Sequence, residues 1–348
     1  MEDDLNYENL IDDVTEAIKK LNLVIFIGAG VSIAQGYPNW NNYIEHLIKY
    51  WQGQVLSVSG EKRLGREHHV VFDLISKSSI SNKRKVDLVN YELKKVFGED
   101  FEKRRLDFEK GYFKNLLPYS IVNQTVESLA SLNAVFITSN YDYEIENHIK
   151  RLKNSVVTIN DLNEFTKNKN GKLQFGDVLH IHGTPDCDVK YFVSSSADYS
   201  KTYLKNRDNF ENLVTWFKET KPTVLFIGAG LEEDEILSLL CKDSKNYALM
   251  KSENTGNQRA DEHYRGVVEG FFSSENHTQI IWYGDEFEKL PLFVKKLVAD
   301  INEKLGTHDF YNQWNNLLNP SINQEEYNKN LDSISNDFKY LSSVLDKV

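Results

Sequence analysis

Short apolar segments alternate along the chain with segments whose apolar residues recur every three or four positions. Leu10, Val14, Ile18 and Leu21 show the helical spacing, which predicts an amphipathic helix. The next segment, Leu23–Ile27, is apolar at every position, as is typical of a strand covered on both faces of a parallel sheet. Similar runs occupy Ala134–Thr138, Ser155–Ile159, Val178–His182, Tyr191–Ser194, Val224–Ile227, Tyr247–Met250 and Gln279–Tyr283. Strands that alternate with helices predict an α/β fold, a Rossmann-like parallel sheet with helices on both faces.

Two regions depart from this alternation. Between Trp40 and about Leu117 only helical patterns occur, a stretch too long for one crossover, so we predict a helical subdomain inserted at about 41–117. The last segment, 306–348, also has helical spacing and no strand pattern. We therefore expect a sheet domain over residues 1–305, including the insert, and a helical C-terminal segment over 306–348.

Composition and charge exclude several classes of function. Acidic residues outnumber basic residues 52 to 41, and a net charge of −11 disfavours nucleic acid as the main ligand. The two cysteines, Cys187 and Cys241, form no Cys-x-x-Cys pair, which argues against a thiolate zinc site or a disulfide framework. The acidic N-terminus does not resemble a signal peptide, and no apolar run reaches the roughly 20 residues of a membrane span. A soluble, cytoplasmic protein is expected.

Two glycine turns nearly repeat each other, Val24–Gly30 and Val224–Gly230, and both follow a predicted strand. Ligands of open α/β sheets bind at the carboxyl edge, where such turns lie. Small residues there allow backbone N–H groups to approach a pyrophosphate. The candidates for binding are Gly28, Ala29, Gly30 and Ser32 in the first turn, and Gly228 and Gly230 in the second. Taken alone, this motif is equally compatible with a tight turn that binds nothing.

Further motifs follow the first turn in a fixed order, each at or near a predicted strand end. Together the five segments resemble the sirtuin superfamily over about residues 23–234. They read Gly28-Ala29-Gly30-Val31-Ser32, Gly36-Tyr37-Pro38-Asn39-Trp40, Thr138-Ser139-Asn140-Tyr141-Asp142, His182-Gly183 and Gly228-Ala229-Gly230-Leu231. The four zinc cysteines of the protein deacylases are missing. The Thr-x-Asn-Tyr-Asp form is similar to the zinc-free sirtuin-like domains of prokaryotic antiphage defence systems.

The resemblance implies an NAD⁺ hydrolase that releases nicotinamide and ADP-ribose and depletes NAD during infection (abortive infection). It implies Asn140 and His182 as catalytic residues, Asp142 and Trp40 as contacts to NAD, and no metal. The chemistry is compatible with these residues, because nicotinamide leaves as a neutral molecule and needs no protonation. An asparagine to hold water or ribose hydroxyls and a neutral histidine as base suffice.

Structural explanations compete for the same residues. Asn140 could cap a helix, Asp142 could be a favourable charge at a helix N-terminus, and Trp40 could be a core aromatic residue. We expect His180 to support the catalytic residues from behind or to be purely structural. A metal bound between His180 and His182 is disfavoured because no further Cys/His cluster accompanies them. The basic runs Lys83–Lys85 and Lys103–Arg105 are expected to be solvated helical faces, and Ser194–Ser196 a loop at the sheet edge.

Two functions stay open after these considerations. The first is NAD⁺ hydrolysis; the alternative is a non-catalytic module that senses NAD or ADP-ribose and regulates a partner ATPase or nuclease. A hydrolase of NAD needs a brake, which could come from assembly, from a HerA-type ATPase encoded alongside, or from a phage protein. Large apolar residues in 306–348, with a stripe at Tyr327, Leu331, Ile334, Phe338 and Leu341, predict a homo-oligomer that uses this segment and the insert.

Overall fold

A computed structural model describes residues 2–57, 66–114, 122–149, 156–158, 176–184, 192–205, 208–231, 234–240 and 242–306. The chain divides into two compact units, Met1–Ala299 and Asp300–Val348. The sheet, the insert and the site described below lie in the first unit. The predicted helical segment 306–348 lies outside the described residues, apart from Gly306.

The described strands all belong to one parallel sheet, whose order is β3-β4-β2-β1-β5-β6-β7. The strands are β1 Leu23–Ile27, β2 Val135–Thr138, β3 Val156–Thr158, β4 Val178–His180, β5 Thr223–Ile227, β6 Asn246–Lys251 and β7 Thr278–Gly284. The larger helices are α1 Glu2–Lys19, α3 Trp40–Ser57, α4 Arg66–Lys77, α5 Asn82–Phe97, α6 Phe101–Lys114, α11 Asp208–Thr220, α13 Gln258–Asn276 and α14 Leu290–Leu305. Shorter helices are α2 Ala29–Ile33, α7 Gln124–Leu129, α8 Glu144–Ile149, α10 Ser196–Tyr199 and α12 Asp234–Leu237.

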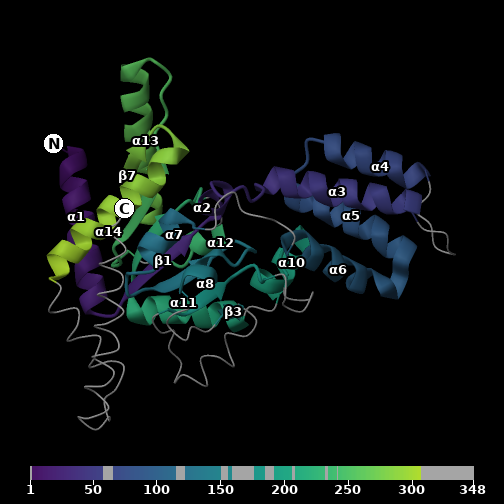
Figure 1. Cartoon of the computed structure of the whole chain (residues 1–348), viewed down its shortest axis with the longest axis horizontal. Coiled ribbons are helices and arrows are strands. Elements are labelled where there is room, and N and C mark those ends of the chain that lie inside the picture. Colours follow the sequence, from purple (N-terminus) through teal and green to yellow (C-terminus); the bar gives the residue numbers. More distant parts are fainter. Residues whose placement is uncertain are drawn as a thin grey trace, which may run out of the picture. The chain divides into compact units, whose positions relative to one another are not determined.

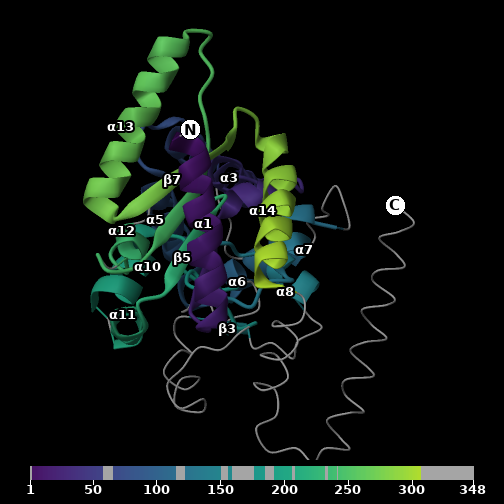
Figure 2. The same cartoon turned by 90° about the vertical axis from the view of Figure 1, so that its left-hand side faces the viewer.

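Alternate residues of the central strands face opposite sides of the sheet, and both sides are buried. On one side Val24 and Phe26 of β1 pack with Leu213 and Phe217 of α11 in a single core cluster. Helix α1 contacts β1, β5 and β7, and its buried residues are not part of that cluster, so it covers the other side (Figure 2). The Rossmann-like α/β architecture predicted from the apolar runs is confirmed.

The segment between β1 and β2 contains the helices α3, α4, α5 and α6, which lie together beside the sheet in Figure 1. They have a core of their own, in which Trp51, Phe72, Leu93 and Phe97 are buried. No strand occurs among the described residues of this insert. The insert therefore folds around its own apolar cluster.

One predicted strand is absent. Residues 192–194 are described and lie outside any strand, while Tyr191 is not described. Among the described residues of this segment, one backbone hydrogen bond joins it to the end of β4, from Val193 N to the carbonyl of His182 (2.9 Å), where a strand would form a series of such bonds. Phe192 and Val193 are buried nonetheless, so their apolar character reflects core packing and not strand pairing.

Candidate active site

The register of the parallel strands aligns four strand ends at the carboxyl edge of the sheet. Ile27 of β1 pairs with Thr138 of β2 and with Ile227 of β5, and Thr138 also pairs with His180 of β4. The residues that follow these four positions therefore gather at one edge. The chain leaves β1 towards β2 on one side and returns to β5 on the other, so the β1–β5 boundary is the topological switch point, where ligands of such sheets bind.

The two glycine turns pack directly against each other at this switch point. Gly28 N donates to Ile227 O and Gly30 N donates to Gly228 O, both at 2.9 Å. A Cβ atom on Gly28 would lie 2.5 Å from Gly228 O, and one on Gly228, whose φ is +65°, would lie 2.7 Å from Val31 N. Contact between the turns thus explains why the motif occurs twice. The N–H groups of Gly28 and Gly30 are already used within the protein, whereas Ala29 and Gly230 are exposed.

Asn140 lies buried beyond the end of β2, and its amide orientation is fixed. Its Nδ2 donates to Gly28 O (3.2 Å) and to Ser32 Oγ (3.0 Å), and its backbone N donates to Thr138 Oγ1 (3.0 Å). The Thr138 hydroxyl in turn donates to Ile27 O at 2.7 Å. Asn140 Oδ1 is buried and has no hydrogen-bond partner among the described residues. A buried, unpartnered acceptor is costly, so this oxygen is suited to accept from a ligand hydroxyl or a water.

Asp142 is coupled to the same network through Ser32. The Ser32 side chain, which accepts from Asn140, also hydrogen-bonds to the Asp142 carboxylate. Burial raises the pKa of Asp142 to about 6, although these hydrogen bonds oppose the shift. Asp142 Oδ1 also accepts from the backbone N of Glu144 (3.0 Å), the first residue of α8. Asp142 therefore has a structural role at a helix start, whereas Asn140 caps no helix.

His180 is a buried ion-pair partner. Its Nδ1 donates to Asn140 O at 2.9 Å, and its Nε2 contacts the Glu146 carboxylate of α8. Because both ring nitrogens face oxygen acceptors, the arrangement favours the doubly protonated ring. Burial disfavours that charge, but the Glu146 carboxylate outweighs it and raises the pKa of His180. The structural role expected for His180 fits this arrangement, which holds the backbone at Asn140.

His182 lies just past the end of β4 and is also buried. Its Nε2 is 2.7 Å from the hydroxyl of Tyr199 in α10, and the two rings meet edge to face, with centroids 5.1 Å apart. The two histidines of the motif thus contact different partners. Among the described residues no group of three or more His, Cys, Asp or Glu side chains could hold a metal.

Aromatic side chains connect Trp40 to His182. Tyr141 is the residue between Asn140 and Asp142. The centroid of its ring lies 6.3 Å from that of Trp40 and 6.3 Å from that of His182. Tyr141 is held in place, because it stacks on Phe192 at 4.4 Å and donates to Val193 O. Trp40 is half-buried and stacks on Tyr43 of the insert. Trp40 therefore belongs to the packing between the insert and Tyr141, the aromatic residue that reaches the ring of His182.

The sequence interpretation missed several residues of this neighbourhood. Arg105 was expected on a solvated helical face, but its side chain is 7% exposed and donates to Asp198 (2.7 Å) and Ser194 (3.0 Å). Tyr43 donates to Glu109 at 2.6 Å, and burial raises the pKa of Glu109 to about 7. Burial in a subdomain core cannot be recognised from a run of basic residues. The only available signal for Arg105 was its three-residue spacing from Phe108 and its four-residue spacing from Phe101.

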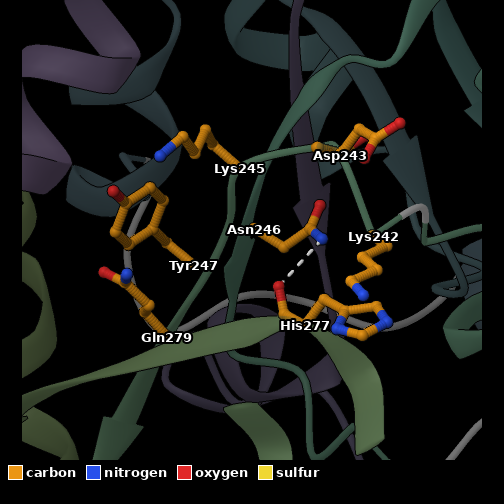
Figure 3. A pocket seen from close by; sticks show the side chains of 8 residues that line it. Lys242, Asp243, Lys245, Asn246, Tyr247, His277 and Gln279 are labelled. Atoms are coloured by element: carbon orange, nitrogen blue, oxygen red, sulfur yellow. Dashed lines mark hydrogen bonds between the residues drawn. The ribbon is translucent and has the colours of Figure 1, made fainter. Parts of the chain in front are cut away.

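A cavity of 420 Å³ lies at the opposite, amino edge of the sheet, where β6 and β7 begin (Figure 3). Its lining includes Lys242, Lys245, Asn246 and His277, and Asn246 Nδ2 donates to His277 O at 3.1 Å. Being on the far edge, it is separate from Asn140 and His182. None of the helices that the structure describes is both long and apolar enough to cross a membrane.

Comparison with known proteins supports the sirtuin-like character of this edge. Residues 134–279 match the family model described as the SIR2-like domain, a range that includes Asn140, His182 and the second glycine turn. The curated protein NAD(+) hydrolase ThsA of Enterococcus faecium is 27% identical over 236 residues, which is 66% of this chain and 42% of that protein. The chain thus spans less than half of that relative. The resemblance to sirtuin-like domains inferred from the motifs is confirmed.

Proposed function

We propose that this chain is an NAD⁺ glycohydrolase that cleaves NAD⁺ to nicotinamide and ADP-ribose. The observation that carries the proposal is the hydrogen bonding of the Asn140 side chain. Its amide hydrogens are both committed to the first glycine turn and Ser32, which leaves a buried Oδ1 without a partner beside the switch point. The similarity to an enzyme named as an NAD(+) hydrolase supports the same activity.

The reaction breaks the bond between C1′ of the ribose and the pyridinium nitrogen. The bonding electrons go to that nitrogen, so nicotinamide departs neutral and the ribose carries the developing positive charge. Water then forms the new bond to C1′, and His182 accepts its proton as a general base. Asn140 Oδ1 orients the water or a ribose hydroxyl. No step requires a metal ion, and we expect activity in the presence of EDTA.

The remaining candidate residues have binding roles in this proposal. The Asp142 carboxylate accepts from the nicotinamide carboxamide, and Trp40 forms part of the pocket wall. Ser32 holds Asn140 and Asp142 in their mutual position. Ala29, Gly30, Gly228 and Gly230 allow the pyrophosphate to approach the switch point closely. Gly28 acts through its carbonyl, which orients Asn140.

Substitution of the two catalytic candidates tests the proposal. We expect His182→Ala and Asn140→Ala each to reduce nicotinamide release by roughly 10²–10⁴-fold, because each removes a group that acts in the transition state. The measurement is chromatographic quantification of nicotinamide from NAD⁺. His263→Ala, at an exposed position of α13, is the matched control and should keep wild-type turnover.

The outcomes separate the two functions considered for this fold. If the wild-type chain binds NAD⁺ but releases no nicotinamide, the alternative of a sensing module that regulates a partner ATPase or nuclease replaces the hydrolase. If a folded His182→Ala or Asn140→Ala variant keeps near wild-type turnover, the assignment of the catalytic residues is wrong.

We further propose that the activity belongs to antiphage defence, where NAD⁺ depletion stops the infected cell, and that the chain acts in the cytoplasm as a homo-oligomer. Its resemblance to zinc-free sirtuin-like defence domains supports this role. A partner such as a HerA-type ATPase would supply the brake that an NAD⁺ hydrolase requires. Co-expression of the chain with the product of a neighbouring gene, followed by measurement of cellular NAD⁺ during infection, tests the role.

A further inference from the structure

The element that contacts His182 is a short helix whose position depends on contacts from several parts of the chain. Helix α10 consists of four residues, Ser196–Tyr199, and runs directly into a π-helical stretch, Ser200–Lys205, whose Tyr203 is buried in the sheet core and donates to Ile181 O at 2.8 Å. The last residue of α10 places a hydroxyl 2.7 Å from His182 Nε2. Whatever fixes α10 therefore also fixes the partner of the proposed catalytic histidine.

Part of the support for α10 is local. Ser195 and Asp198 form a capping box, in which the Ser195 hydroxyl accepts from Asp198 N and the Asp198 side chain accepts from Ser195 N. Asp198 Oδ2 also accepts from Ser194 N at 3.3 Å. This arrangement shapes the turn, but it does not determine where the turn lies relative to β4.

Further support comes from the helical insert, through three contacts. Arg105 of α6 donates to Asp198 at 2.7 Å, and Asp87 of α5 accepts from Ala197 N at 3.0 Å. The ammonium group of Lys83, also on α5, lies 3.4 Å from the centroid of the Tyr199 ring. These contacts join segments about 90 to 116 residues apart in the sequence.

The ion pair is the strongest of the three. Arg105 is almost fully buried, and its Nη2 also donates to Ser194 Oγ and to Phe192 O. Although burial would raise it, the pKa of Asp198 is lowered by the Arg105 guanidinium. A buried charge that loses its partner is costly, so this pair resists separation and ties α6 to the start of α10.

We propose that the helical insert orients the imidazole of His182, with Arg105 and Asp198 holding α10 so that the Tyr199 hydroxyl stays on His182 Nε2. Tyr199, Asp198 and Arg105 are positioning residues in this arrangement, and a movement of the insert is transmitted to the active site. The consequence for turnover rests on the proposed NAD⁺ hydrolysis, whereas the consequence for the ring does not.

Two measurements on the full chain test this inference. The first is nitrogen-15 NMR of the histidine rings, with the His182 signals identified by their loss in His182→Ala. The second is kcat and KM for nicotinamide release. Tyr199→Phe removes only the hydroxyl, and Arg105→Gln removes the ion pair without touching His182. We expect both variants to shift the His182 ring nitrogens towards tautomer-averaged values and to lower kcat about tenfold with little change in KM.

Controls and a second route keep the test decisive. Lys103→Gln on α6 removes the charge of an exposed basic residue, and Tyr264→Phe on α13 removes the hydroxyl of an exposed tyrosine. Both controls should leave the His182 signals unchanged. If Arg105→Gln does not fold, as judged by its thermal transition, Lys83→Ala replaces it and should produce the same direction of change. Wild-type His182 signals in folded Arg105→Gln or Lys83→Ala would overturn the inference. A wild-type chain without NADase activity would contradict the proposed function, while the NMR comparison would still decide the positioning role.

Discussion

At the scale of single residues, the site consists of polar groups whose hydrogen bonds leave very little freedom. Asn140 can present only Oδ1 to a ligand, because Gly28 O and Ser32 Oγ take both amide hydrogens. Both ring nitrogens of His180 are hydrogen-bonded, one to Asn140 O and the other to the Glu146 carboxylate. If the chain hydrolyses NAD⁺ as proposed, this network positions Asn140 Oδ1 before the reaction, which lowers the cost of reaching the transition state.

Asp142 makes a pH-dependent prediction at this scale. Since burial raises its pKa to about 6, the carboxylate is ionised above pH 6 and protonated below it. If the ionised form accepts from the carboxamide of NAD⁺, KM should rise as pH falls through 6, by up to about tenfold per pH unit. Asp142→Asn should raise KM at pH 8 and remove this dependence.

The measurement is KM for NAD⁺ between pH 5 and 8. Asp73→Asn serves as the control, because that exposed carboxylate pairs with Lys77 far from the site in sequence, and its KM profile should match the wild type. A KM profile for Asp142→Asn that still rises below pH 6 would show that another group is responsible.

At the scale of elements, the two glycine turns act as one unit. The apolar runs before them predicted β1 and β5 correctly, because strands covered on both faces must be apolar throughout. The two turns touch each other because β1 and β5 are neighbours in the sheet. This contact itself requires small residues. The glycines alone are therefore weaker evidence for NAD⁺ than the sequence motif suggests.

Replacing a glycine of this contact tests its structural role. In Gly228→Ala the new methyl group would lie 2.7 Å from Val31 N on a residue with φ of +65°. We expect a loss of about 1–3 kcal/mol in the free energy of unfolding, measured by urea denaturation. Gly266→Ala in α13, where nothing lies within 4 Å of the new methyl, should instead stabilise the chain by roughly 0.5–1 kcal/mol. Equal stabilities of the two variants would contradict this account.

At the scale of the whole molecule, we predict self-association. The insert exposes apolar side chains on α4 and α5, with Val70 53%, Leu74 63% and Tyr91 62% accessible. Exposed apolar groups of this size often mark a protein interface. The apolar stripe predicted in the C-terminal segment lies outside the described residues.

Light scattering, which measures the molar mass in solution, tests this prediction directly. The full chain at micromolar concentration should have the mass of a dimer or a larger assembly, and a chain ending at Leu305 or a Leu74→Lys variant should be smaller. Leu204→Lys, which changes an exposed leucine outside the insert, is the control for the loss of one apolar residue. A monomeric full chain would contradict the prediction.

The sequence by itself determined the parallel sheet and the location of the insert, and it placed Asn140 and His182, which the resemblance to sirtuin-like domains implies as catalytic residues, at the carboxyl edge. These features follow from local patterns: an apolar run predicts a buried strand, and parallel strands bring their carboxyl ends to one edge. The prediction of a strand at Tyr191–Ser194 failed, because Phe192 and Val193 are buried without strand pairing, and such burial produces the same apolar run as a strand.

Only the tertiary structure decided how the side chains meet. Arg105 and Asp198 are 93 residues apart, and Lys83 and Tyr199 are even further apart. Their contacts depend on how the insert packs against the sheet edge. No pattern of apolar and polar residues along the sequence indicates that packing. The same holds for the hydrogen bonds that commit the N–H groups of Gly28 and Gly30 and leave Asn140 Oδ1 without a partner. Hydrogen bonds require a donor and an acceptor at matching positions in space, and a sequence records only their order along the chain.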